Sequence, residues 1–429
     1  MTRVFSATIY LALFILLPNL SQAMESSNPF EEARVSGSLR TGYWQSDRTL
    51  SDETGVSTAS VWLRAEPDLS DNSWMVFDGR LGKNSYQPDN NTYNWYKNNE
   101  SDLREAYLEL RTQNIDFKLG KQIITWGRAD KINPTDNLSP HDFTLLTPKT
   151  ADQKSGTMAA KSSYYFDSDS LTLIWLINFN PNQLPLPTTN PMLQYIEHTP
   201  TNTRKQGAIK FNHIGQNLDW SISYFNGFDL NPDLNLESFS PTSATIGLQH
   251  HRIRVIGADA STTIGLYGLR AESAYIFTED TRGTDPTIKN PFFSLVAGGD
   301  RTFFDSFNIN FQYLIRITSK YHNAEDTPDP ILREVAIQQA ILNNELDRIV
   351  QGVSARINDK WLSDTLTAEI AGVYTFPRHG YFINSNISYA LTDDWKFIAG
   401  ADYFGGDDQT FYGRLKKNSG YYIQLQYGF

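Results

Sequence analysis

Histidine, aspartate and serine are the residues of this 429-residue sequence that could carry catalysis or bind a metal. No histidines have the spacing of an HExxH zinc site, and there is no Gly-x-Ser-x-Gly nucleophile turn. The acidic turns 167–169 and 407–408 could hold calcium only weakly. Neighbouring histidines in a strand point to opposite faces and could not share one ion. We therefore expect no catalytic residue, no metal site and no cofactor; the histidines are His141, His198, His213, His250, His251, His322 and His379.

Charged side chains that alternate with large apolar ones are the second candidate for function. From Phe307 to Ile317 every second residue is apolar and the residues between are mostly polar, which is typical of a strand with one wet face. If the apolar faces meet lipid, the charged residues line an interior that favours hydrated polar solutes. The excess of bases suggests a mild anion preference; pairing across neighbouring strands is an equal alternative. The expected pore-lining residues are Arg40, Arg64, Arg80, Arg111, Lys118, Lys161, Lys210, Arg254, Arg270, Arg316, Arg356 and Lys396, with Asp78, Glu105, Glu109, Glu272, Glu369 and Asp402.

The same alternation recurs along the whole chain. Each run has roughly ten residues, the length that a tilted strand needs to cross hydrocarbon. Aromatic residues such as Trp175, Phe376 and Trp395 stand near the run ends, as in the interfacial girdles of membrane barrels. Long and short connections alternate, and an even strand number returns the chain to its starting side. The sequence predicts an all-β fold, a single transmembrane antiparallel β-barrel of about 18 strands over residues 35–429, with one strand starting near residue 244.

The first 23 residues predict export. Arg3 precedes an apolar stretch from Val4 to Leu17, and Ser21-Gln22-Ala23 offers small residues for cleavage. We expect a removed signal peptide, 1–23, followed by a short periplasmic segment, 24–34. The chain has no cysteine, which excludes disulfide scaffolds and thiol chemistry, and its net charge of −11 argues against nucleic acid as a partner.

The C-terminal residues alternate aromatic and aliphatic side chains and finish on phenylalanine: Tyr421, Ile423, Leu425, Tyr427 and Phe429. In this the sequence resembles the outer-membrane β-barrel porins of Gram-negative bacteria, whose last strand carries such a pattern as an assembly signal. The resemblance implies location in the bacterial outer membrane. It implies as partners the membrane lipids and lipopolysaccharide, the barrel-assembly machinery and small hydrophilic solutes.

Residues 127–156 form the third long connection, the position at which general porins fold a constriction inward. Turn formers such as Asn133-Pro134 predict a compact loop. Gly120-Lys121-Gln122 followed by Trp126-Gly127 is similar to a pattern in 18-stranded porin-like proteins that include alginate-export channels. Those exporters have a long periplasmic loop near the C-terminus, whereas the corresponding connections here are short. The expected constriction residues are Trp126, Arg128, Asp130, Lys131 and Asp136; a surface loop packed on the rim is the alternative.

Two local features interrupt the alternation. Strict alternation places Lys121 on the lipid side, at a cost of about 2 to 4 kcal/mol at midplane, so we expect a bulge at Gly120. Asp329 and Pro330 have the residue types that begin a helix, and the apolar spacing through Leu346 predicts a short amphipathic helix in an external loop. We expect that helix to pack against other loops or to cover the channel mouth.

These patterns favour a channel for passive diffusion of small hydrophilic solutes, with a mild preference for anions. One alternative is a dedicated export or uptake conduit for a specific polysaccharide or other solute. Another is a barrel that presents its loops as an adhesin or carries a membrane enzyme, although we expect no enzyme activity.

Overall fold

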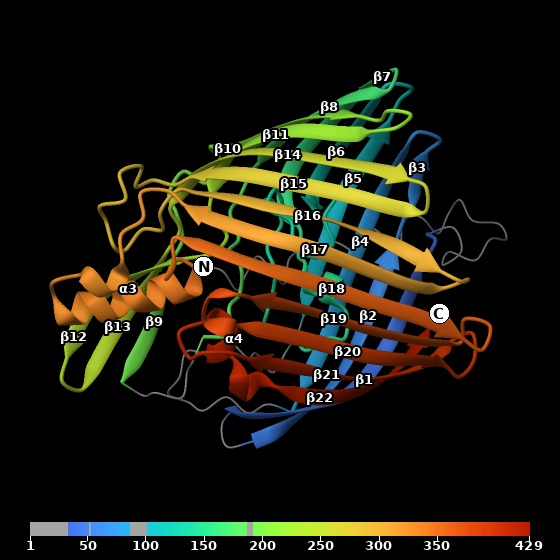
Figure 1. Ribbon diagram of the computed structural model, residues 1–429. Helices are drawn as coiled ribbons and strands as arrows, with labels where there is room; N and C mark the ends of the chain where they lie inside the picture. Colours follow the sequence, from blue (N-terminus) through green and yellow to red (C-terminus); the bar gives the residue numbers. More distant parts are fainter. Residues whose placement is uncertain (1–32, 51–52, 86–100, 187–191) are drawn as a thin grey trace, which may run out of the picture.

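The computed structural model describes residues 33–50, 53–85, 101–186 and 192–429. The expected signal peptide and all but the last residues of 24–34 lie outside these residues. Eighteen long strands of the described chain form one antiparallel barrel. Figure 1 shows how these strands follow one another around the wall. They are β1 (Ser36–Leu50), β2 (Glu53–Ala65), β4 (Ser73–Asn84), β5 (Asp102–Arg111), β6 (Ile115–Gln122), β7 (Thr157–Phe166), β8 (Asp169–Leu176), β10 (Gln206–His213), β11 (Asp219–Phe228), β14 (Arg252–Ile264), β15 (Tyr267–Phe277), β16 (Phe292–Phe303), β17 (Phe307–Thr318), β18 (Ile349–Trp361), β19 (Leu366–Thr375), β20 (Tyr381–Ala390), β21 (Trp395–Gly405) and β22 (Gly420–Gly428).

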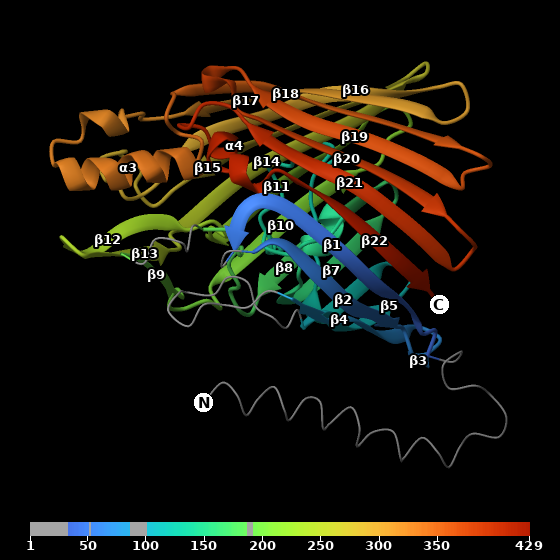
Figure 2. The same cartoon turned by 90° about the horizontal axis from the view of Figure 1, so that it is seen from below.

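The barrel is closed by its first and last strands. β22 pairs with β1 from Ser38↔Gly428 to Ser46↔Gly420, and Figure 2 shows the two strands side by side. The backbone N–H of Gly37 donates to the Phe429 carbonyl at 2.8 Å, which ties the last residue into this seam. The prediction of an all-β antiparallel barrel of about 18 strands is confirmed.

Short turns and long connections lie at opposite ends of the barrel. The long connections carry the secondary structure seen at the left of Figure 1, and we call this the loop end. The strand expected near residue 244 is β13 (Ser243–Gln249), which belongs to a separate external sheet; the barrel strand of that region, β14, starts at Arg252. Alternation alone does not distinguish a strand of an external hairpin from one of the barrel.

The outer face of the barrel is apolar. On β8 and β11 the outward side chains include Trp175 and Ile222, which are 51% and 53% exposed. The C-terminal row follows the same phase, with Tyr421, Ile423 and Phe429 all exposed. A belt of exposed apolar side chains on a closed barrel is the surface that a lipid bilayer covers. No helix of the described residues is long and apolar enough to span a membrane.

The predicted external helix is present as α3 (Pro330–Leu342), with Asp329 accepting the N–H groups of Ile331 and Leu332. Its buried face contacts an external three-stranded sheet through Val335, which packs with Leu248. The helix therefore packs against other loops, the first of the two expected arrangements. The remaining elements are β9 (Leu193–His198), β12 (Asp233–Ser240), β3 (Asp68–Ser70), α4 (Phe411–Arg414), η1 (Thr150–Gln153), η2 (Ala324–Asp326), η3 (Pro377–His379) and η4 (Lys416–Asn418).

The expected bulge at Gly120 is wrong. β6 keeps its register with both neighbours through Gly120, and the register shift lies instead in β5, opposite Asp78 and Gly79. Gly120 has a φ of +135°, and an added Cβ would overlap the Ala106 carbonyl, so glycine serves a close backbone approach there. Lys121 stays in the phase of exposed Leu119 and neutralises its charge by pairing with Asp102 at 3.2 Å.

Candidate functional site: the loop inside the barrel

The connection from β6 to β7, residues 123–156, is anchored to the inner wall by Glu272 of β15. This carboxylate is 1% exposed. Its Oε1 accepts the backbone N–H and the hydroxyl of Thr135 at 2.8 and 2.7 Å, and its Oε2 accepts the N–H groups of Arg128 and Ala129 at 3.0 and 3.2 Å. The Asn133 amide adds a fifth donor at 3.1 Å. A buried carboxylate is stable only when several donors point at it, and here the loop supplies all five. The same hydrogen bonds fix the position of the loop on the wall.

Arg128 extends from this anchor toward a second group of wall residues. Its Nε donates to Oδ1 of Asp259 at 2.6 Å, and its Nη2 donates to the Asn212 amide oxygen at 2.8 Å. Asp259 also receives Lys210 Nζ at 3.3 Å and the Ser221 hydroxyl. These partners come from β10, β11 and β14, which are neighbours in the barrel.

The tip of the loop reaches the wall formed by β17, β18 and β19. Asp130 accepts Arg356 Nε at 2.6 Å, and its backbone exchanges hydrogen bonds of 3.0 and 2.9 Å with the Gln312 amide. Lys131 Nζ lies 2.9 Å from Glu369 Oε1. The loop leaves from β6, so these contacts carry it across the interior to strands that lie far around the barrel.

Two of the expected constriction residues lie at the base of the loop. Trp126 is buried in an apolar cluster with Leu138, Ile174 and Phe225. Asp136 accepts the Trp126 N–H at 3.2 Å and pairs with Lys154 at 2.6 Å. The structure thus brings Arg128, Asp130 and Lys131 to inward side chains of other strands, while Trp126 and Asp136 hold the base of the loop.

The second half of the loop lies along β1, β2, β4 and β5, where arginines surround Trp62. The guanidinium carbons of Arg40, Arg104 and Arg80 stand 4.1, 5.3 and 5.4 Å from the indole centroid. The loop supplies Asp152 to Arg40 at 2.7 Å and Asp142 to Arg80 Nη2 at 3.3 Å. Arg104 pairs with Asp78 of the wall at 3.1 Å.

Arg80 differs from the other two arginines of this group. It is 7% exposed, and its Nε and Nη1 atoms have no hydrogen-bond partner among the residues that the structure describes. Two buried guanidinium donors without an acceptor cost free energy of folding unless a water molecule or an anion accepts their hydrogen bonds. We call Trp62 with Arg40, Arg80 and Arg104 the Trp62 cluster.

Most of the expected pore-lining residues have the inward strand phase, and many pair with a neighbour. Lys118 pairs with Glu109 at 2.8 Å, and Arg270 with Asp300 at 2.5 Å. Pairing across strands therefore occurs beside the pairing with the loop. The residues with inward phase are Arg40, Arg64, Arg80, Arg111, Lys118, Lys161, Lys210, Arg270, Arg316, Arg356, Lys396, Asp78, Glu105, Glu109, Glu272, Glu369 and Asp402.

The inward assignment of Arg254 is wrong. Ile253 and Val255 are buried inside the barrel with the loop, so Arg254 and Ile256 face outward. The inward prediction for Arg254 places the odd-numbered residues of β14 on the outer face, and Asp259 is therefore missing from the predicted interior. Asp259 is in fact buried in the interior and binds Arg128. The alternating charged and apolar residues at the start of β14 do not show from the sequence which set faces inward. The apolar cluster around the loop determines that Ile253 and Val255 do.

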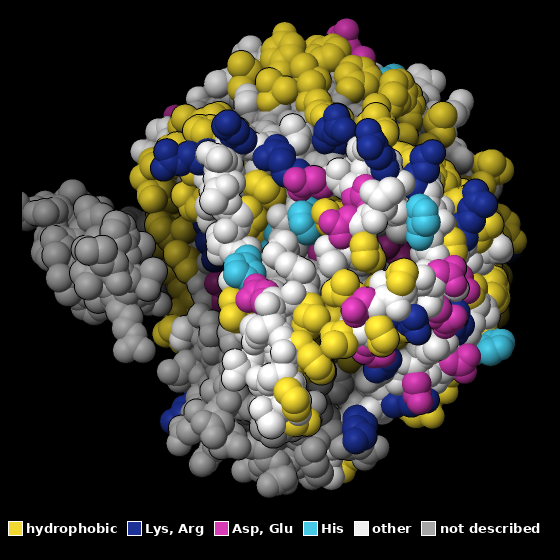
Figure 3. All heavy atoms as spheres, turned by 90° about the vertical axis from the view of Figure 1, so that its left-hand side faces the viewer, with side chains coloured by type: hydrophobic (Ala, Val, Ile, Leu, Met, Phe, Trp, Pro, Cys, Tyr) yellow, Lys and Arg dark blue, Asp and Glu magenta, His cyan; other side chains and the backbone are white. Residues whose placement is uncertain are grey.

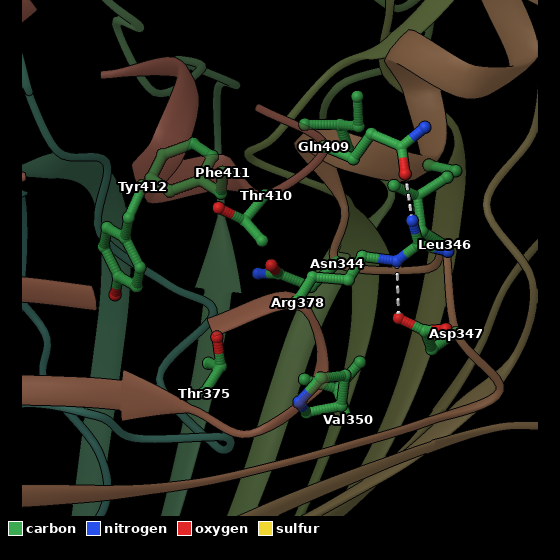
Figure 4. A pocket seen from close by; sticks show the side chains of 13 residues that line it. Asn344, Leu346, Asp347, Val350, Thr375, Arg378, Gln409, Thr410, Phe411 and Tyr412 are labelled. Atoms are coloured by element: carbon green, nitrogen blue, oxygen red, sulfur yellow. Dashed lines mark hydrogen bonds and ion pairs between the residues drawn. The ribbon is translucent and has the colours of Figure 1, made fainter. Parts of the chain in front are cut away.

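A small pocket of about 30 Å³ lies between the end of α3 and the segment around α4. Figure 4 shows Arg378 between Asp347 and Gln409, with Phe411 and Tyr412 on the opposite side. Arg378 Nε donates to Asp347 Oδ2 at 2.9 Å. No group of three or more histidine and carboxylate ligands is found among the residues that the structure describes.

Comparison with solved structures shows which known fold the barrel has. Pseudomonas aeruginosa OpdQ superposes with a TM-score of 0.53 at 11% identity, covering 92% of this chain and 97% of OpdQ. OccK11 (OpdR) and OpdL of the same organism each give 0.52, at 11% and 12% identity, over 92% of this chain and 95% and 98% of theirs. The chain has the outer-membrane porin fold. No protein-family model matches the sequence, and no curated protein sequence matches it. In this fold, loop 123–156 contacts inward side chains of β14, β15, β18 and β19.

Proposed function

We propose that the protein is an outer-membrane channel for passive diffusion of small hydrophilic solutes, narrowed by loop 127–156. The observation that carries the proposal is the loop itself, which crosses the interior and meets charged inward side chains on β14, β15, β18 and β19 and an amide on β10. A barrel of about 18 strands is wider than its own side chains can fill, so its interior is aqueous where no loop fills it. Export would follow from the signal peptide 1–23.

The preferred solutes are small anions. The Trp62 cluster supports this preference, because two buried donors of Arg80 have no partner among the described residues and two further guanidinium groups stand beside the same indole. An anion bound there would gain charge-assisted hydrogen bonds from a preformed group. A carboxylate or phosphate group suits the planar guanidinium fork better than chloride does.

A dedicated conduit for one anionic solute is the second candidate. Trp62 is 8% exposed, and its indole N–H donates to the Ser60 hydroxyl at 3.0 Å, which gives the cluster a fixed shape. A fixed aromatic and cationic surface can bind one solute more tightly than others of equal charge. Competition between small carboxylates of different shape separates this candidate from general diffusion.

The test is the reversal potential across a planar bilayer in a salt gradient. Arg80→Gln is expected to lower the permeability ratio of anion to cation by up to about fivefold, since one charge at about 4 Å in water contributes about 1 kcal/mol. Arg301→Gln is the matched control, because Arg301 lies in the outward phase of β16 and donates to Tyr267. Equal ratios for both variants and the unmodified protein would remove the anion preference from the proposal.

A further inference from the structure

The second half of the interior loop is attached to connections of the loop end as well as to the barrel wall. Asn182, in the connection that follows β8, is 8% exposed. Its amide oxygen accepts the backbone N–H of His141 at 2.7 Å, and its amide nitrogen donates to the Asn231 amide oxygen at 2.8 Å. Its own backbone N–H donates to the Leu230 carbonyl at 2.9 Å. One buried amide therefore joins the interior loop to the segment between β11 and β12.

Backbone hydrogen bonds beside Asn182 fix the residues on both sides of Asp142. The Gln183 N–H donates to the His141 carbonyl at 2.9 Å, and the Phe143 N–H donates to the Gln183 carbonyl at 3.0 Å. Together they form a short parallel bridge between Asp142 and Gln183. The backbone of Asp142 is thus held from the loop end, although this residue belongs to the loop inside the barrel.

Asp142 in turn determines how much positive charge the Trp62 cluster presents. Its Oδ2 lies 3.3 Å from Arg80 Nη2, and its Oδ1 accepts the N–H and the hydroxyl of Thr144 at 3.0 and 2.5 Å. A carboxylate at this distance offsets part of the guanidinium charge, and the Coulomb attraction between the two falls as they separate. The attraction of the cluster for anions therefore depends on where Asp142 stands.

The far side of Asn182 is fixed by the external sheet. The Asn231 carbonyl accepts Lys289 Nζ at 3.2 Å. The same Nζ lies 2.9 Å from Asp229 Oδ2 and 3.5 Å from Oδ1 of Asp233, the first residue of β12. The side chains of Lys289 and Asp233 are 4% and 1% exposed, and buried ion pairs of this kind are costly to break. Figure 3 shows the loop end face on, where acidic, basic and histidine side chains lie together beside the apolar wall. The support for the interior loop therefore begins at the external sheet.

We propose that Asn182 is a positioning residue for the selectivity of the channel: it holds Asp142 against Arg80 and so lowers the anion preference of the Trp62 cluster. This inference rests on the proposed channel function. Loss of the Asn182 amide leaves the His141 N–H without its acceptor, and a buried backbone donor without a partner gains free energy by moving to reach water. Asp142 then moves away from Arg80, and the cluster attracts anions more strongly.

The experiment measures the permeability ratio of anion to cation, from the reversal potential of the full-length protein across a planar bilayer in a potassium chloride gradient. Asn182→Ala is expected to raise the ratio about twofold or more, and Asp142→Asn up to about fivefold, the effect of one charge at about 4 Å in water. The double variant is expected to match Asp142→Asn, because the effect of Asn182 runs through Asp142. Asn343→Ala is the matched control and should leave the ratio unchanged, since its amide is also 8% exposed but donates to the Gln339 carbonyl at the end of α3.

An unchanged ratio in Asn182→Ala would overturn the inference, and so would an equal shift of this variant with and without Asp142. Should Asn182→Ala fail to fold, Asn231→Ala removes the acceptor of the Asn182 amide at an exposed position. A smaller shift toward anions is expected there, and an unchanged ratio overturns the inference in the same way.

The shift toward anions can be measured whichever ion the unmodified protein prefers, which separates this inference from the proposed function. A shift in Asn182→Ala without anion preference in the unmodified protein refutes the proposed anion preference alone. Anion preference in the unmodified protein without a shift refutes the role of Asn182 alone. Absent conductance in the unmodified protein refutes both.

Discussion

Thr135 donates both its backbone N–H and its hydroxyl to one oxygen of Glu272, at 2.8 and 2.7 Å. The two residues are 137 positions apart in the chain, and the contact joins the interior loop to β15. Gly127 belongs to the same anchor: its φ is +97°, and an added Cβ would overlap the carboxylate of Glu272. The position of the loop is therefore set by one buried charge and by the backbone that fits around it.

Replacing Glu272 should release the loop without opening the barrel. Glu272→Ala removes a buried acceptor of five hydrogen bonds, each worth about 1.5 to 3 kcal/mol when the acceptor is charged. We expect faster protease cleavage within 127–136 and larger fluctuations of the open-channel current. Glu325→Ala, at an exposed position of η2, is the control. A loop as resistant to protease as in the unmodified protein would contradict the anchoring role of Glu272.

Substitution of Gly127 should have a similar but distinguishable effect. Gly127→Ala imposes a strained left-handed backbone and a clash with Glu272, whereas Gly265→Ala imposes only the backbone strain, because nothing lies within 4 Å of its added Cβ. The backbone term alone costs about 1 kcal/mol. Protease resistance of the loop should fall in Gly127→Ala and stay unchanged in Gly265→Ala. Equal behaviour of the two variants would show that the contact with Glu272 has no role.

Loss of the last residue should reduce barrel assembly. Phe429 exchanges two backbone hydrogen bonds with Gly37 at the seam between β22 and β1, at 2.8 and 3.1 Å, and its ring is exposed on the outer face. Deletion of Phe429 is expected to lower the amount of folded, heat-modifiable protein in the outer membrane. Phe429→Tyr keeps the aromatic ring and should assemble normally. Normal assembly of the deletion would contradict the expected assembly signal.

The external sheet should loosen as the solution becomes alkaline. Burial opposes the charged form of His251, but the hydrogen bond to Asp233 at 2.8 Å and the Asp233 charge overcome it and raise the pKa of His251; Glu279 acts in the same direction and Lys289 against it. A raised pKa contributes stability that is complete below the ordinary histidine value of about 6.5 and is lost as pH rises through the folded-state value. Hydrogen exchange in β12 should therefore be faster at pH 9 than at pH 6.

The control for this pH effect is His251→Gln, which cannot titrate. We expect its exchange in β12 to be fast at both pH values, apart from the chemical dependence of exchange that a peptide reference corrects. The pairs of His250 with Glu197 and of His198 with Glu237 lie in the same external region and remain in the variant. A full pH response in His251→Gln would assign the effect to those pairs instead.

The strand pattern could be predicted from the sequence because each strand meets lipid on one face and the interior on the other. Alternation located β8, β17 and β22 within a few residues, and the Asp329-Pro330 pair located α3. The phase of β14 could not be predicted, because its inward side chains near the loop are apolar and pack on Ile124 and Trp126.

The contacts of the loop with the wall could not be predicted from the sequence either. Compact turns at Asn133-Pro134 predict a loop of fixed shape, but not that Asp130 meets Arg356, 226 positions later in the chain. Such pairs depend on how the barrel closes, and closure is a property of the whole set of strands. The Trp62 cluster combines β1, β2, β4 and β5 in the same way. Arg40 and Arg80 were expected in the interior, but Arg104 was not, and the sequence did not predict that the three stand around one indole.

The most direct test of the account is single-channel recording of the purified full-length protein in a planar lipid bilayer. We predict discrete conductance steps in symmetrical salt, and a larger unit conductance when Glu272→Ala frees the loop from the wall. A folded, heat-modifiable protein that inserts but gives no steps above the bare bilayer would contradict the claim that this barrel encloses a water-filled path.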